Sequence, residues 1–113
     1  MSGDFVLDPP GKVPLGLAWM PSGAAVQWVV GAVADRVEDA GLAAELREFV
    51  AADYSFISLG MFTAAQAAEI TRVIRESLTA AAEARFPGSE VVLGWIAELV
   101  AMVERAEAAP DVG

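Results

Sequence analysis

The sequence predicts an all-α fold, a small four-helix bundle preceded by an extended N-terminal arm. Three observations favour this class. Apolar residues recur at three- and four-residue steps over 63–86, N-cap residues precede other apolar runs, and four prolines prevent a long helix in the first 21 residues. We expect a single domain, 1–113, divided into an arm at 1–21, a helical bundle at 22–109 and a frayed tail at 110–113. A short strand at 15–19 or 54–59 is compatible with this fold, and the two stretches could pair.

The clearest predicted helix spans 63–86. Thr63 is a suitable N-cap, and Gln66 can reach back to the Thr63 amide, so the two form a capping box. Pro87 ends the helix because it cannot continue the hydrogen-bond ladder. One face of this helix is apolar, formed by Ile70, Val73, Ile74, Leu78, Ala81 and Ala82.

Three further helices are predicted, at 23–40, 42–52 and 90–108. Ser22 and Ser89 are expected N-caps, and Gly41 fits the left-handed residue that often follows a helix. The last helix is apolar around most of its circumference, so we expect it to be central in the core or shared across a dimer interface.

Composition excludes several classes of function. The chain carries 16 acidic and 7 basic residues, a net charge of −9, which argues against nucleic-acid binding and against anionic membrane surfaces. It contains neither cysteine nor histidine, which removes disulfides, thiol nucleophiles and histidine-based acid–base catalysis. No catalytic, cofactor-binding or metal-binding residue is assigned, and we expect no cofactor.

The uncharged stretch 13–34 raises the question of a membrane span or signal peptide. The segment Pro-Ser-Gly at 21–23 interrupts it, and acidic residues precede it where a signal peptide would carry basic ones. We therefore expect a cytoplasmic protein. Because 56% of the residues are apolar and the mean hydropathy is +0.49, we expect surplus apolar surface that is covered by another chain, most simply in a homodimer.

Besides the part of the arm at 15–20, two surfaces are candidates for that contact. The first is an acidic corner, formed by Asp35, Glu38, Asp39, Glu45 and Glu48. Its first three members are expected at the C-terminal end of a helix, where the macrodipole disfavours negative charge, which suggests a basic partner. The second is an apolar lip at 54–62, a connection that should be polar but contains Tyr54, Phe56, Leu59, Met61 and Phe62. The lip either plugs one end of the bundle or stands exposed for a partner.

The leading functional prediction is a non-enzymatic protein-interaction module, an adaptor or immunity-type small acidic bacterial protein by analogy of size and charge, which self-associates or binds a basic partner. One alternative is a bundle that encloses a small apolar ligand with Trp28, Trp95 and Met102. A second is an enzyme that uses carboxylates and Mg²⁺ or Ca²⁺. The spacing of Asp35-x-x-Glu38 and Glu45-x-x-Glu48 is similar to that in all-α nucleotide pyrophosphohydrolases, but these pairs lie too close together to reproduce that family's geometry.

Overall fold

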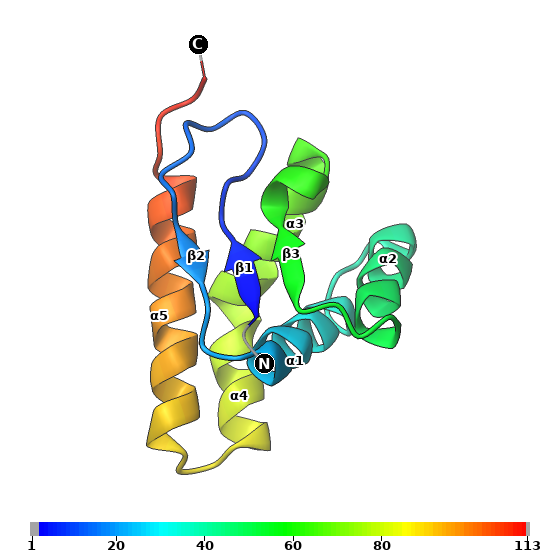
Figure 1. Ribbon diagram of the computed structural model, residues 1–113, viewed down its shortest axis with the longest axis vertical. Coiled ribbons are helices and arrows are strands. Elements are labelled where there is room, and N and C mark those ends of the chain that lie inside the picture. Colours follow the sequence, from blue (N-terminus) through cyan, green and yellow to red (C-terminus); the bar gives the residue numbers. More distant parts are fainter. Residues whose placement is uncertain (1–2, 113) are drawn as a thin grey trace.

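The computed structural model describes residues 3–112 and combines helices with a small mixed β-sheet (Figure 1). The strands are β1 (Asp4–Val6), β2 (Ala18–Trp19) and β3 (Phe56–Ser58). The helices are α1 (Gly23–Ala34), α2 (Ala40–Ala51), α3 (Ala64–Val73), α4 (Thr79–Arg85) and α5 (Glu90–Glu107). A π-helical segment, Ile74–Leu78, joins α3 to α4, and a 3-10 turn, Leu59–Met61, follows β3. Residues 1, 2 and 113, which the prediction assigned to the arm and the tail, lie outside the described residues.

The predicted all-α class is wrong, because the chain builds a three-stranded sheet in the order β2-β1-β3. Phe5 of β1 lies opposite Trp19 in the antiparallel pair with β2 and opposite Ile57 in the parallel pair with β3. Strands do lie within 15–19 and 54–59, but they do not pair with each other, since β1 separates them. The prolines that excluded a helix from the first 21 residues follow β1 and leave it intact.

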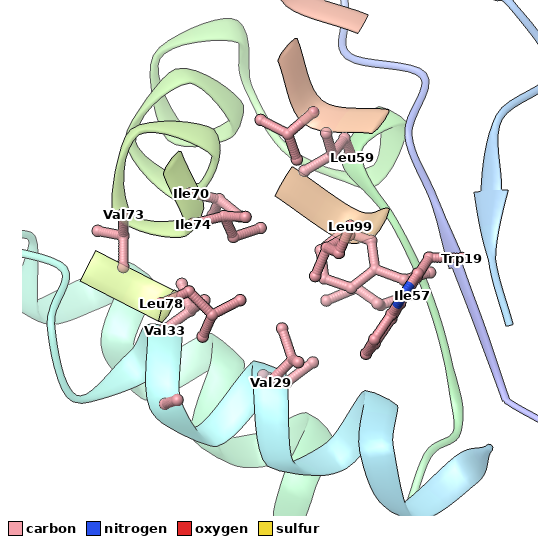
Figure 2. Close-up of a cluster of buried hydrophobic side chains, with 14 of the residues drawn as sticks. Trp19, Val29, Val33, Ile57, Leu59, Ile70, Val73, Ile74, Leu78 and Leu99 are labelled. Atoms are coloured by element: carbon pink, nitrogen blue, oxygen red, sulfur yellow. The ribbon is translucent and has the colours of Figure 1, made fainter. Parts of the chain in front are cut away.

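The side chains at positions 5, 7 and 19 belong to the core, so this part of the chain is not an arm laid over a bundle. Phe5 and Leu7 are each only 1% exposed, and Trp19 is equally buried. Figure 2 shows Trp19 and Ile57 of the sheet beside Leu99 of α5. The sheet is therefore part of the core, because its buried side chains Phe5, Trp19 and Ile57 belong to one hydrophobic cluster with buried side chains of the helices.

The connection between the first two helices differs from the prediction. Helix α1 ends at Ala34, not at residue 40, and Gly41 lies within the first turn of α2. The reason is Asp39, whose carboxylate accepts hydrogen bonds from the amides of Gly41 and Leu42 and so caps the start of α2. The next helix also contributes, since the Glu69 carboxylate accepts a 2.7 Å bond from the Glu38 amide and a 3.4 Å bond from the Asp39 amide.

The long helix predicted at 63–86 is present as α3, the π-helical segment and α4 in continuous succession. Its capping box is confirmed, because Thr63 Oγ1 accepts from the Gln66 amide and Gln66 Oε1 accepts from the Thr63 amide. Ser22 and Ser89 cap α1 and α5 as predicted. The π-helical turn contributes Ile74 and Leu78, both fully buried, and Figure 2 shows Leu78 near Val33 of α1.

Residues 110–112 lie along the loop between β1 and β2. The Val13 amide donates to the Pro110 carbonyl at 2.8 Å, and the Val112 amide donates to the Gly11 carbonyl at 2.9 Å. Lys12 adds a 2.9 Å ion pair with Asp111. Residues 110–112, expected to fray, thus have specific partners. Within residues 3–112, no helix combines the length and apolar character that a membrane span requires.

The buried position of β1 predicts a large stability difference between two residues near the start of the chain. Replacing Phe5 with alanine should destabilise the fold by about 3–5 kcal/mol, because it empties a closed site in the core. Replacing Leu15, which is exposed, should change stability by less than about 0.5 kcal/mol. Urea unfolding of both variants measures the difference, and similar small effects would show that the first strand is a peripheral arm.

The anchoring role of Glu69 separates it from the other glutamates on the same helix line. Glu69→Ala should lower the free energy of unfolding by about 1–2 kcal/mol, since it leaves the Glu38 and Asp39 amides without their charged acceptor. Glu83→Ala is the matched control, because Glu83 is exposed two heptads further along. Equal losses in thermal or urea unfolding would exclude this role for Glu69.

Candidate functional site

The C-terminal end of α2 fixes the start of the apolar lip. Asp53 adopts a left-handed conformation, with φ of 60°. The Tyr54 amide then donates to the Phe49 carbonyl and the Asp53 amide to the Val50 carbonyl, both at 3.1 Å, which is the Schellman arrangement. Its usual apolar contact is present as an edge-to-face pair of the Phe49 and Tyr54 rings, 5.7 Å apart. Gln27 of α1 clamps this turn by donating a 2.7 Å bond to Asp53 Oδ1.

The apolar lip has one buried face and one exposed face. Its exposed members are Tyr54 (61% exposed), Phe56 (52%) and Met61 (56%), whereas Ile57, Leu59 and Phe62 are buried. Strand β3 accounts for Phe56 and Ile57, because successive side chains of a strand point to opposite sides. In the 3-10 turn that follows, Leu59 is buried and Met61 is exposed. Both interpretations of the sequence therefore describe part of the segment: half of it fills the core, and the other half presents three large apolar side chains to solvent.

The exposed half of the lip borders a hollow of about 430 Å³ against α2, which we call the lip hollow. Its lining residues are Glu45, Glu48, Phe49, Ala52, Tyr54, Met61 and Phe62. Five residues predicted as partner contacts from two separate stretches thus meet at one place. Phe56 and Leu59, also predicted, do not line it: Phe56 is exposed on β3, and Leu59 is fully buried.

The predicted acidic corner is divided by the fold. Asp35 follows the last residue of α1 and pairs with Arg47 at 3.4 Å. Asp39 caps α2, where the positive end of the helix dipole favours its charge, contrary to the prediction for a helix C-terminus. Glu38 contributes to this region through its backbone amide, which donates a hydrogen bond to the Glu69 carboxylate. Glu45 and Glu48 alone among the five reach the lip hollow.

The residues predicted for a ligand pocket are partly brought together. Trp28 and Trp95 line an apolar hollow of about 180 Å³ with Trp19, whose indole N–H donates a 2.8 Å bond to the Trp95 carbonyl. Met102 is packed on the core elsewhere and does not line this hollow. We call it the tryptophan hollow, since it gathers all three tryptophans of the chain.

The acidic residues show no geometry of a metal centre in the part of the chain that the structure describes. Within residues 3–112 there is no group of three or more acidic side chains placed to hold a metal ion.

The shortest ion pair among the described residues joins Arg75 of the π-helical segment to Glu107 of α5, at 2.6 Å. Arg75 donates hydrogen bonds to both carboxylate oxygens of Glu107, and these bonds together with the negative charge of Glu107 raise the pKa of Arg75 above its usual value.

Two features of the candidate site are absent from the sequence-based prediction. Phe49, which was assigned to neither candidate surface, is a wall of the lip hollow. The five-residue step from Phe49 to Tyr54 is the spacing of the apolar contact in a Schellman motif, and it is the signal that identifies this wall. Gln27 carries no comparable signal, because its partner Asp53 lies on a different element.

Comparisons with known proteins provide no relative for this chain: no protein-family model, curated protein or solved structure matches it.

Proposed function

We propose that this protein is a non-enzymatic protein-interaction module that self-associates through its apolar lip. The observation that carries the proposal is the exposure of Tyr54 and Met61 at the lip hollow and of Phe56 on β3. Large apolar side chains that remain exposed on a folded surface are typical of protein contacts, and aromatic residues and methionine are enriched there. The Schellman turn and the Gln27 clamp hold this surface in place, which reduces the entropy lost on binding.

The position of β3 supports a second copy of the chain as the partner. β3 is at an edge of the sheet, and an unpaired strand edge is a surface on which another strand can add. Two copies related by a twofold axis would bring the same lip residues into contact from both sides. The contact would then close on itself as a dimer.

The expected affinity is modest. Full burial of a large apolar side chain is worth about 1.5–3 kcal/mol, and about half of each exposed lip residue remains to be buried, giving about 1 kcal/mol for each. Six such side chains in a symmetric dimer contribute about 6 kcal/mol, against an association cost of roughly 4–15 kcal/mol. The gain exceeds even the lowest association cost by only about 2 kcal/mol, so self-association through these side chains alone should be weak, in the millimolar range or weaker, and tighter association requires a further contact such as pairing at the β3 edge.

Polar substitutions in the lip should weaken the dimer. The double variant Phe56→Ser, Met61→Ser removes two of the three exposed side chains from each copy, so the dimer dissociation constant should rise by more than about tenfold. Sedimentation equilibrium over a wide concentration range measures this constant. Val91→Ser is the control, because Val91 is a similarly exposed apolar residue on α5. A wild-type chain that stays monomeric at every concentration would overturn self-association.

The charge beside the lip predicts the sign of the salt dependence. In a symmetric dimer, Glu45 and Glu48 add like charges near the contact of two chains that each carry −9. Raising NaCl from about 0.01 M to about 1 M shortens the Debye length from roughly 30 Å to roughly 3 Å, so association should strengthen. Weakening with salt would contradict contact between like-charged surfaces and would instead fit a basic partner.

A further inference from the structure

A second surface, opposite in charge to the rest of the protein, lies on the other side of α2. It is a groove of about 780 Å³ whose lining residues come from α1 and its C-terminal end, α2 and α4, and whose charged members are Asp35, Arg36, Arg47 and Arg85. We call it the arginine groove. Three arginines and one aspartate give it a local charge of +2, in a chain whose net charge is −9.

The three guanidinium groups keep donors available for a ligand. Arg36 donates one bond of 2.8 Å to the Ala32 carbonyl, at the end of α1. Arg47 contacts the Asp35 carboxylate at 3.4 Å, which offsets part of its charge. Within residues 3–112, Arg85 takes part in no ion pair or side-chain hydrogen bond, and its guanidinium carbon lies 4.8 Å from the centre of the Phe86 ring. Since a guanidinium group has five N–H donors, the groove can bind an anion, with Arg85 as its least committed cation.

The arginine groove and the tryptophan hollow are adjacent. Trp28 lines both, and the neighbours Arg85 and Phe86 line one each. The Phe86 ring meets the Trp28 ring edge-on at 5.2 Å. The Arg85 guanidinium group and the tryptophan hollow are thus separated by about one aromatic ring, that of Phe86.

The size of the tryptophan hollow limits what can occupy it. At about 180 Å³ it is smaller than the roughly 300–1,000 Å³ of pockets that enclose whole drug-sized ligands. It is large enough for a short aliphatic chain or a single ring. Its apolar walls include Val92, Ile96 and Ala25, so a ligand's polar end would have to lie outside it.

Two neighbouring hollows share lining residues with the tryptophan hollow. One shares Ser22 and Ala24 and contains Asp53. The other is the arginine groove, which shares Trp28. Of these two, the arginine groove has cations among its lining residues and therefore suits an anionic head group.

We propose that these two surfaces form one binding site for a small amphipathic anion, a medium-chain carboxylate in chemical class. Its apolar chain occupies the tryptophan hollow, and its carboxylate binds in the arginine groove with Arg85 as the main contact. This site is separate from the apolar lip and does not depend on self-association.

The test compares three ligands that share one apolar chain and differ in head group: octanoate, octanol and octylammonium. Binding is followed by calorimetry and by tryptophan fluorescence, since all three tryptophans line the hollow. Octanoate should bind at least about tenfold more tightly than octanol, and octylammonium more weakly than either, because only the carboxylate gains charge-assisted hydrogen bonds. Equal binding of octanoate and octanol, or binding of neither, overturns the proposal.

Variants separate the two halves of the site. Arg85→Gln should lower octanoate affinity about tenfold and leave octanol binding unchanged, whereas Arg85→Lys should retain most of the affinity. Arg105→Gln is the control, because Arg105 is exposed on α5 and lines neither surface. Ala24→Leu fills the tryptophan hollow from an exposed position of α1 and should abolish binding of both octanoate and octanol.

Two further measurements exclude other occupants. A glutamate octapeptide, which carries negative charge without an apolar chain, should bind far more weakly than octanoate, and equal affinity would overturn the amphipathic site in favour of an acidic protein segment. The lip variant Phe56→Ser, Met61→Ser should bind octanoate as tightly as the wild type. Loss of octanoate binding in that variant would show that the two sites are not separate.

Discussion

The pairing of β1 with strands on both sides is the constraint on which the rest of the structure depends. Phe5 stands between Trp19 and Ile57, so burial of one side chain fixes the positions of two strands that are far apart in sequence. Trp19 in turn donates to the Trp95 carbonyl and so ties the sheet to α5. β3 lies within the apolar lip and contains Phe56, and Trp19 of β2 lines the tryptophan hollow. Both candidate sites thus take their positions from the same short strand.

Helix α2 separates these sites and gives them opposite charge. Glu45 and Glu48 line the lip hollow, while Arg47 lies on another side of the helix and lines the arginine groove. Both ends of α2 are held by neighbouring helices, since Glu69 of α3 binds the amides before it and Gln27 of α1 binds the turn after it. A rigidly placed helix with two distinct faces allows one small domain to present two independent surfaces.

Features that depend on neighbouring residues could be predicted from the sequence. Features that depend on contacts between distant segments could not. The capping box at Thr63 involves neighbouring residues and was readable directly. Phe5 and Leu7, both buried, alternate with less buried residues, which is the pattern of a strand. A three-residue strand is nevertheless too short to be recognised from the sequence without its partners. The lip residues could be proposed because their apolar character contradicts a connection. The arginine groove could not be predicted, since its cations come from three separate segments and meet only in the folded chain.

The parallel pairing of β1 with β3 has a consequence for the order in which the protein folds. β1 can form a hairpin-like pair with β2 early in synthesis, but its other edge must wait until α1, α2 and the whole of residues 56–58 have left the ribosome. Contacts so distant in sequence are slow to form because their loop-closure entropy is lost first. Helices α1 and α2 lie between the two strands along the chain, and their mutual packing shortens the effective loop. We therefore expect this helical pair to form the folding nucleus and the sheet to be completed last.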